Sequence, residues 1–486
     1  MAHLTARDLL DLVLDEGSWL SWDTPPARAG VSAEYAAELA AAQARSGAEE
    51  SVLTGEGRLG GRRVAVLVSE FGFLAGSVGR DAADRLVNAI QRATRERLPL
   101  VGAPASGGTR MQEGTPAFVQ MVRIGEAISA HKTAGLPYLV YLRHPTTGGV
   151  MATWGSLGHV TIAEPRALLG FLGPKVVELV TGAPLPPDVQ QAENLRMHGI
   201  IDAVVLPTDL RTVALNALDV IYAPRDTPAR ALPEDRLEAP DAWDAITRTR
   251  RPDRPGVREL LGAAEVVVPL FGSGRGEHDR GIRLALARFG AAPCVLVAQD
   301  RRSQAERPFG PEGLRVAQRG FELASALSLP VVTVIDTRGA ALSAAAENGA
   351  IAGEIARTLA ALLGVGTPTV SLMLGEGSGG GALAFLPADR IVAAQHAWLT
   401  PLPPEGASAI VHGDTTHAAD MARTQRIGAF DLRELGVVDR IVAERPDAAD
   451  EPDDFVRRVA AVLEAELLGL LAAGPGTPAD RASRYA

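Results

Sequence analysis

The sequence predicts an α/β fold. Residues 100–103 and 138–142 are short apolar runs, and their continuous hydrophobic character is typical of strands that are buried on both faces. An amphipathic stretch over residues 115–133 lies between these runs and predicts a helix. Strands that alternate with helices in this way indicate a parallel sheet with helical connections.

Internal repetition indicates that this fold occurs twice. Pro99 and Pro330 each precede a short apolar run, and so do Pro137 and Pro368. Both pairs are 231 residues apart, since 330 − 99 and 368 − 137 give the same number. Matches in the same order and at one spacing favour a duplicated domain over a coincidence of common strand openings.

A charged, proline-rich stretch separates the two copies. It has no sustained apolar period, which is typical of a linker. We therefore predict an N-terminal domain over residues 1–228, a linker over residues 229–255 and a C-terminal domain over residues 256–486. The polar tail, residues 474–486, is expected to fray.

The composition excludes several classes of protein. The chain of 486 residues has 47% apolar and 22% charged residues, as a globular protein does. Its 58 acidic and 48 basic residues give a net charge of −10, which disfavours nucleic acid and anionic membranes as partners. Cys294 is the single cysteine, and no long uncharged apolar segment occurs. We therefore expect no disulfide, no metal site, no membrane span and a cytoplasmic location.

Two glycine-rich loops are the strongest candidates for chemistry. They are PTTGGV at residues 145–150 and GEGSGGGA at residues 375–382, and each opens a predicted helix. Glycine lets a ligand approach the backbone, and the free amides of such a turn can hold a developing oxyanion. Neither loop has the pattern of a phosphate or dinucleotide site. The alternative is that the glycines only permit tight turns; their recurrence in both halves favours a function.

Conventional catalytic side chains are poorly represented. Asp336, Glu113 and Glu164 could act as acids or bases, but helix capping and loop hydrogen bonds explain each of them equally well, so none is assigned as a general base. His412 and His417 lie close in the sequence without an evident third ligand, which predicts a polar surface loop and not a metal site.

Longer motifs resemble the carboxyltransferase of bacterial acetyl-CoA carboxylase. The first half resembles its β subunit, with SGGTRMQEG at 106–114, PTTGGV at 145–150, IAEP at 162–165 and GPKVVE at 173–178. The second half resembles its α subunit, with FGPEG at 309–313, IDT at 335–337, GEGSGGGALA at 375–384 and PEG at 404–406. The resemblance implies two tandem crotonase-like domains, each a superhelix of ββα units, fused in the order β then α.

The resemblance also implies a reaction and a set of site residues. The family moves a carboxyl group from carboxybiotin, held on a separate carrier protein, to the α-carbon of an acyl-CoA, here expected to be acetyl-CoA giving malonyl-CoA. Gly148 and Gly149 would hold the thioester enolate, and Gly380 and Gly381 the ureido oxygen of biotin. The implied substrate-binding residues are Ser106, Gly107, Gly108, Thr109, Arg110, Gly173, Pro174, Gly339, Gly379, Pro404, Glu405 and Gly406. No metal is implied.

The implied partners are a biotin carboxyl carrier protein, a biotin carboxylase and a further copy of the chain, in a homodimer or larger assembly. Two departures from the family leave alternatives open. The β subunit's four-cysteine zinc ribbon is absent, and the loop from Arg338 to Asn348 differs from the family's pattern. The chain could instead be a biotin-independent acyl-CoA decarboxylase or carboxyltransferase of the same fold, or a non-catalytic subunit of a carboxylase complex.

Overall fold

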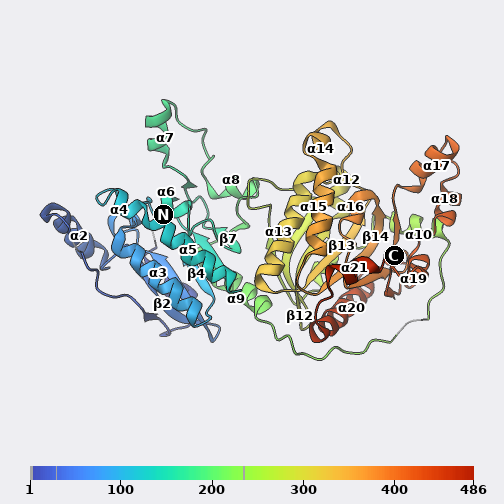
Figure 1. Cartoon of the computed structure of the whole chain (residues 1–486), viewed down its shortest axis with the longest axis horizontal. Helices are drawn as coiled ribbons and strands as arrows, with labels where there is room; N and C mark the ends of the chain where they lie inside the picture. Colours follow the sequence, from blue (N-terminus) through green and yellow to red (C-terminus); the bar gives the residue numbers. More distant parts are fainter. Residues whose placement is uncertain (1–3, 29, 234–235) are drawn as a thin grey trace. The chain divides into compact units, whose positions relative to one another are not determined.

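The computed structural model describes residues 4–28, 30–233 and 236–486. The chain forms two compact units, Met1–Leu215 and Asn216–Ala486 (Figure 1). The stretch 229–255 that we expected to be a linker belongs to the second unit and contains helix α10 (Ala242–Thr249). Its residues 234–235 lie outside the described residues, and the division at residues 228 and 256 stays a prediction.

The first unit is built on a mixed sheet. In the described residues its strands follow the order β1 (Leu20–Ser21), β2 (Val52–Leu59), β3 (Arg62–Ser69), β4 (Leu100–Ala103), β5 (Tyr138–Leu142), β7 (Val160–Ala163) and β9 (Ala203–Val204). β1, β2 and β3 pair antiparallel, and the strands from β3 to β9 pair parallel. The two predicted strands are confirmed, and every residue of β4 and β5 is buried.

The helices of the first unit connect these strands. They are α1 (Ala6–Val13), α2 (Ala33–Ser46), α3 (Arg80–Arg95), α4 (Thr115–Phe118), α5 (Gln120–Thr133), α6 (Gly148–Met151), α7 (Pro174–Thr181) and α8 (Ala192–Met197), while α9 (Leu210–Ile221) spans the division between the two units after Leu215. The apolar faces of α3 and α5, with Leu86, Ile90 and Ile124, complete one core with the sheet. The helix predicted over 115–133 is interrupted at Val119, because the Val122 amide bonds the Val119 carbonyl in a tighter i→i+3 turn.

The second unit repeats this order. Its strands are β10 (Val266–Leu270), β11 (Ile282–Phe289), β12 (Ala292–Gln299), β13 (Val331–Thr337), β14 (Thr369–Ser378), β15 (Arg390–Ala394) and β17 (Arg440–Val442), with β16 (Trp398–Thr400) paired to the end of β14. The first three pair antiparallel and the rest parallel. The same sequence of pairings in both units confirms the duplication.

A small pairing at the carboxyl edge of the sheet is also duplicated. In the first unit β6 (Thr146–Thr147) pairs with β8 (Leu169–Gly170). In the second unit the end of β14, Gly377 and Ser378, pairs with β16 in the same parallel sense. Each of these short pairings comes directly before the consecutive glycines of one of the two loops. Both glycine segments therefore leave the sheet at the same place and in the same direction.

The helices of the second unit include long, buried ones. They are α10, α11 (Val257–Gly262), α12 (Arg301–Glu306), α13 (Pro311–Leu327), α14 (Ala344–Asn348), α15 (Ile351–Leu363), α16 (Gly379–Leu383), α17 (Pro404–His412), α18 (Ala418–Thr424), α19 (Ala429–Glu434), α20 (Pro452–Ala473) and α21 (Pro478–Ser483). α13 begins with a proline in its first turn, where no amide hydrogen is needed, and contributes Leu314, Phe321 and Ala324 to the core. None of the helices in the described residues combines the length and apolar character needed to cross a membrane.

The expectation that the C-terminal tail frays is wrong. Residues 478–483 form α21, and the Arg481 side chain is almost fully buried. Its guanidinium donates to the Asp389 carboxylate at 2.8 Å and to the Val365 carbonyl oxygen at 2.7 Å. A buried charge that is paired and hydrogen-bonded fastens the tail to the second unit, a long-range contact for which the local composition gives no signal.

Candidate active site

The first glycine loop brings two predicted segments together. Gly108 and Gly148 have φ of +109° and +62°, and a Cβ atom on Gly148 would lie only 3.0 Å from the Gly108 Cα. The Ser106 amide donates to the Pro145 carbonyl oxygen at 2.6 Å, and the Thr147 amide to the Ser106 carbonyl oxygen at 2.9 Å. Positive φ and this close approach both require glycine, so the backbone is shaped here by its sequence.

The backbone amides of Gly148 and Gly149 in this loop have different surroundings. The Gly148 amide donates to the Phe171 carbonyl oxygen at 2.9 Å. Gly149 is the second residue of α6, where the first amides of a helix have no acceptor within the helix, and Gly149 itself is only half-buried. A Cβ at this glycine would lie 3.1 Å from the Thr109 hydroxyl oxygen and 3.2 Å from Met121. In the first loop, Gly149 is therefore the donor that a ligand could use.

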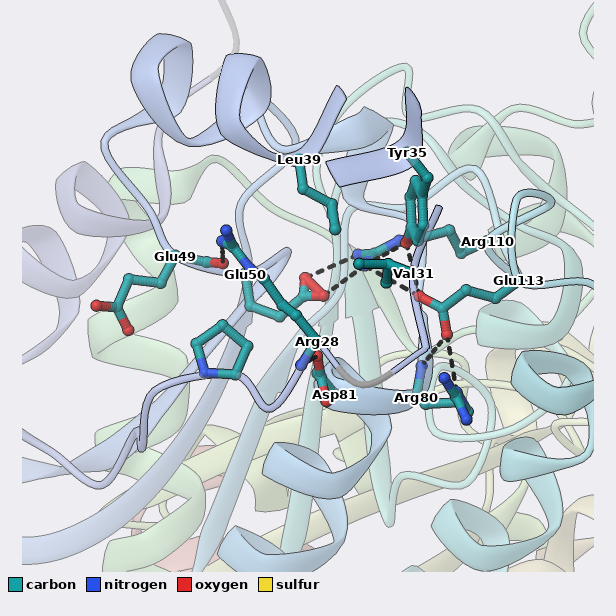
Figure 2. A pocket seen from close by; sticks show the side chains of 11 residues that line it. Arg28, Val31, Tyr35, Leu39, Glu49, Glu50, Arg80, Asp81, Arg110 and Glu113 are labelled. Carbon is teal, nitrogen blue, oxygen red and sulfur yellow. Dashed lines mark hydrogen bonds and ion pairs between the residues drawn. The ribbon is translucent and has the colours of Figure 1, made fainter. Parts of the chain in front are cut away.

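Arg110 holds the predicted segment 106–114 from inside the protein. Its guanidinium is 1% exposed and forms two hydrogen bonds to the Glu50 carboxylate, at 2.5 and 2.8 Å (Figure 2). It also donates to the Ser77 carbonyl oxygen at 2.7 Å. Because both charges are buried and paired, Arg110 is engaged with the protein, and contact of its side chain with a substrate stays a prediction.

Glu113 extends the same network. One carboxylate oxygen accepts from the Tyr35 hydroxyl and the other from the Arg80 amide, both at 2.7 Å (Figure 2). Glu113 thus ties the loop to α2 and to the start of α3. The cavity between these residues measures about 20 Å³, which is room for about one water molecule. The interpretation of Glu113 as a loop hydrogen-bond acceptor is confirmed, and Glu164 likewise accepts from the His144 amide at 2.8 Å.

The second glycine loop has the same backbone as the first. Gly339 and Gly379 have φ of +122° and +68°. The Gly339 amide donates to the Thr337 hydroxyl at 3.0 Å, just as the Gly108 amide donates to the Ser106 hydroxyl at 3.0 Å.

The repeat of 231 residues therefore matches three consecutive positions of the two loops. Gly379 corresponds to Gly148, Gly380 to Gly149, and Gly381 to Val150.

Gly380 and Gly381 have different surroundings. Gly380 is half-buried beside Ile355 and is the second residue of α16, and the first amides of a helix have no acceptor within the helix. Gly381 is buried, and a Cβ there would lie 2.7 Å from the Phe309 ring. The carbonyl oxygen of Gly381 accepts from the Gln299 side chain at 2.8 Å. Of the two glycines assigned to the ureido oxygen, Gly380 is thus the more accessible one.

A series of ion pairs links the predicted segments of the second unit. The buried Glu376 carboxylate lies 3.3 Å from the Arg338 guanidinium and 3.5 Å from that of Arg250. Arg250 in turn binds the Glu405 carboxylate at 2.5 and 3.1 Å, and this lowers the pKa of Glu405. These ion pairs link the loop from Arg338 to Asn348, the second glycine loop and the start of α17.

Asp336 lies beneath the second glycine loop. It is fully buried at the end of β13, and burial raises its pKa to about 6, with Arg301 and Arg254 opposing the shift. One of its carboxylate oxygens accepts from the Glu376 amide at 3.3 Å, and the other has no hydrogen-bond partner. The repeat places Ala105 at the corresponding position of the first unit, since 336 − 231 is 105.

The remaining predicted residues begin two exposed helices. Gly173 and Pro174 start α7, and Pro404, Glu405 and Gly406 start or lie in α17. No residue of α7 is buried, and Figure 1 shows it standing away from the sheet of its unit. Exposed apolar side chains of these helices are Leu179 at 85%, Val180 at 74% and Ile410 at 76%. Both units therefore expose large apolar side chains on these helices.

The histidine pair lies at the surface, as predicted. The rings of His412 and His417 stack at 4.4 Å between centroids, and His417 bonds the Asp414 carboxylate at 3.1 Å. Within the part of the chain that the structure describes, no three His, Cys, Asp or Glu side chains are grouped to hold a metal ion.

Several residues of these networks were not singled out in the sequence, among them Tyr35 and Gln299. Tyr35 has no local pattern that would reveal it, whereas Gln299 could have been noticed as a polar residue that ends an apolar strand.

Comparisons with known proteins agree with this architecture. The carboxyl transferase domain family matches residues 1–470. A Mycobacterium tuberculosis protein named "Probable biotin-dependent acyl-coenzyme A carboxylase beta3 subunit" is 56% identical over 100% of this chain and 98% of its own length. A Salinispora arenicola protein named "Acetyl-coenzyme A carboxylase carboxyl transferase subunits beta/alpha" is 36% identical over 90% of this chain and 81% of its own length.

A solved structure is similar along most of the chain. The crystal structure of the 12S transcarboxylase, described as a hexamer with methylmalonyl-coenzyme A bound, has a TM-score of 0.75 at 21% identity, over 97% of this chain and 91% of that one. The chain belongs to the carboxyl transferase domain family, which confirms the resemblance. Its predicted fold class, two tandem crotonase-like α/β domains, is confirmed as well.

Proposed function

We propose that this chain is the carboxyltransferase component of a biotin-dependent acyl-CoA carboxylase. It moves a carboxyl group from carboxybiotin on a carrier protein to the α-carbon of an acyl-CoA. The observation that carries the proposal is the duplicated glycine loop, which opens a short helix in each unit and places Gly149 and Gly380 among the first amides of those helices. The names of the relatives at 56% and 36% identity support the same reaction.

The reaction creates negative charge on two oxygens, which suits two loops. Carboxybiotin releases CO2 and leaves a ureido anion with negative charge on its oxygen. This anion takes the α-proton of the acyl-CoA, and the resulting enolate, with negative charge on the thioester oxygen, attacks the CO2. We assign Gly148 and Gly149 to the thioester oxygen, and Gly380 and Gly381 to the ureido oxygen. Backbone donors of this type are typically worth about 3 to 4 kcal/mol each in the transition state.

We propose acetyl-CoA as the acceptor and malonyl-CoA as the product, in the cytoplasm and toward fatty acid synthesis. The acetyl assignment concerns the length of the acyl chain, and one or two extra methylenes change binding by only about 1 to 3 kcal/mol. Competition between acetyl-CoA and propionyl-CoA, measured as the ratio of their kcat/KM values, tests it. A ratio in favour of propionyl-CoA would overturn the acetyl assignment and leave the reaction class intact.

The proposed partners follow from the same reaction and from the exposed helices. A biotin carboxylase and a biotin carboxyl carrier protein supply carboxybiotin. A second copy of the chain covers the apolar side chains of α7 and α17, in a homodimer or a larger assembly. Sedimentation at micromolar concentration should then show at least a dimer, and an active, stable monomer would contradict this.

The direct test of the function is the reverse reaction. Purified protein is incubated with malonyl-CoA, with and without free biotin, and acetyl-CoA is measured. Decarboxylation that depends on biotin supports the proposal. Decarboxylation of equal rate without biotin would favour the biotin-independent alternative, and the absence of turnover in both would favour a non-catalytic subunit.

A further inference from the structure

Gln299 links the second glycine loop to the central sheet. It is the last residue of β12, and its side chain is fully buried. Its amide nitrogen donates to the Gly381 carbonyl oxygen at 2.8 Å, and its amide oxygen accepts from the Asp336 backbone amide at 3.0 Å. One side chain thus satisfies two buried backbone groups that belong to different elements, the end of β13 and α16.

The described residues of the first unit contain no such link. β3 corresponds to β12, and Ser69 ends β3 as Gln299 ends β12. The Ser69 hydroxyl is buried and makes no hydrogen bond in the described residues. The residue that corresponds to Gly381 there is Val150, whose buried side chain can hold the loop by packing.

The second loop needs this support because of its composition. Gly379, Gly380 and Gly381 follow one another, and glycine has the greatest backbone freedom of all residues. No side chain of these three residues can anchor the loop by packing. The hydrogen bond from Gln299 fixes the carbonyl of Gly381, and the adjoining peptide planes, including the Gly380 amide, are oriented with it.

We propose that Gln299 is a positioning residue for the carboxyl transfer reaction: it holds the second glycine loop so that the Gly380 amide faces the ureido oxygen of biotin. This inference rests on the proposed function, because it deepens the assignment of the second loop. It predicts that loss of Gln299 impairs the biotin side of the reaction and leaves the acyl-CoA side unchanged.

The test compares Gln299→Met, Gln299→Glu and Ser69→Ala with the parent chain. Gln299→Met keeps the length of the side chain and removes both hydrogen bonds. Ser69→Ala is the matched control, at the corresponding strand end of the first unit. Biotin-dependent decarboxylation of malonyl-CoA yields kcat/KM for free biotin and KM for malonyl-CoA, and hydrogen exchange measured by mass spectrometry reports on residues 376–386.

For Gln299→Met we expect kcat/KM for biotin to fall roughly tenfold to a hundredfold, with KM for malonyl-CoA unchanged, since a displaced catalytic donor has effects of this size. Amides of residues 376–386 should exchange faster, and those of the first loop should not. Ser69→Ala should match the parent chain in all three measurements.

Gln299→Glu serves where Gln299→Met folds poorly. Its carboxylate can still accept from the Asp336 amide, but it can donate to the Gly381 carbonyl oxygen only when protonated. Its kcat/KM for biotin, relative to the parent, should therefore rise as the pH is lowered, which a purely structural role would not produce. A ratio that is independent of pH would overturn the proposal.

Failure of the two proposals can be told apart. If the parent chain shows no biotin-dependent turnover, the proposed function is overturned and the role of Gln299 with it. If the parent is active and Gln299→Met retains kcat/KM for biotin, or loses its affinity for malonyl-CoA to the same degree, the positioning role alone is overturned.

Discussion

The two glycine loops share one backbone and differ in what supports it. Both have a glycine at positive φ that follows a short parallel pairing, and then a half-buried glycine whose amide lies in the first turn of a short helix. Neutral groups surround the first loop. The Phe171 carbonyl oxygen accepts from the Gly148 amide, and Thr109 and Met121 lie beside Gly149. The second rests on Gln299 and on buried charges that include Asp336 and Glu376.

This difference indicates how one fold came to serve two reactants. The duplication preserved the geometry that presents a backbone donor, and the surroundings of each donor diverged. The donor itself is a backbone amide, so neither loop requires a titrating side chain at the reacting atoms. Changes that affect only one loop should therefore affect only one unit or one reactant.

The largest expected effect comes from breaking the buried ion pair of either unit. Arg110→Met leaves the Glu50 carboxylate unpaired in the first unit, and Arg254→Met removes the arginine partner of Glu444 in the second, where His396 still lies 2.8 Å from that carboxylate. Each change should lower the free energy of unfolding by about 3 to 5 kcal/mol, because the remaining carboxylate is buried without its arginine partner. Denaturant unfolding of each variant measures this loss.

The control for the ion pairs is Arg63→Met, which removes a partly exposed arginine paired with Glu56 and Glu96. Exposed pairs contribute little to stability, so this variant should unfold close to the parent. If Arg110→Met and Arg254→Met are as stable as Arg63→Met, the buried ion pairs do not stabilise their units as we describe.

A smaller effect should distinguish the glycines within each loop. Gly148→Ala and Gly379→Ala place a side chain at positive φ, which costs roughly 1 to 3 kcal/mol. Gly148→Ala should be the more destabilising of the two, because its Cβ would lie 3.0 Å from the Gly108 Cα, whereas at Gly379 the nearest atom is 3.6 Å away. Thermal melting measures the order.

The matched controls are Gly149→Ala and Gly380→Ala, where φ is not positive. Their added Cβ atoms contact only the far ends of side chains, at 3.0 to 3.1 Å, so these variants should melt closer to the parent than Gly148→Ala does. Equal melting temperatures for all four variants would show that the turns do not require glycine.

The sequence predicted more of the backbone elements than of the side-chain contacts that hold them in place. The strands at 100–103 and 138–142, the duplication and the two glycine loops follow from local patterns and from one repeat distance, and the structure contains them. The relative exposure of Gly380 and Gly381 could not be predicted, because it depends on the Phe309 ring, which is about 70 residues away in the sequence. The contacts of Gln299, Tyr35 and Arg481 were missed for the same reason.

A still smaller effect is a pH-dependent change in stability that should occur in the second unit and not in the first. Burial raises the pKa of Asp336 to about 6, above its usual value, so the native state holds this proton more tightly than the unfolded state does. The stabilisation is present below the ordinary pKa and is lost as the pH rises through 6. Asp336→Asn should therefore gain stability relative to the parent between pH 5 and pH 8, by an amount on the order of 1 kcal/mol.

Melting of both proteins at these two pH values tests the prediction for Asp336. A constant difference between them would mean that Asp336 does not titrate in this range. Ala105→Ser, a neutral polar change at the corresponding position of the first unit, is the control and should show no pH-dependent difference from the parent.

The central claim is that the two loops act on different reactants, and reciprocal kinetics of Gly149→Val and Gly380→Val test it most directly. Each variant should lose about 3 kcal/mol of transition-state stabilisation, a fall in rate of roughly a hundredfold. Gly149→Val should lose turnover of acyl-CoA while its affinity for biotin is retained, and Gly380→Val should show the converse, with melting temperatures confirming that both fold. If both variants are folded and react within a few-fold of the parent, the glycine loops are only turns, and the division of labour described above is wrong.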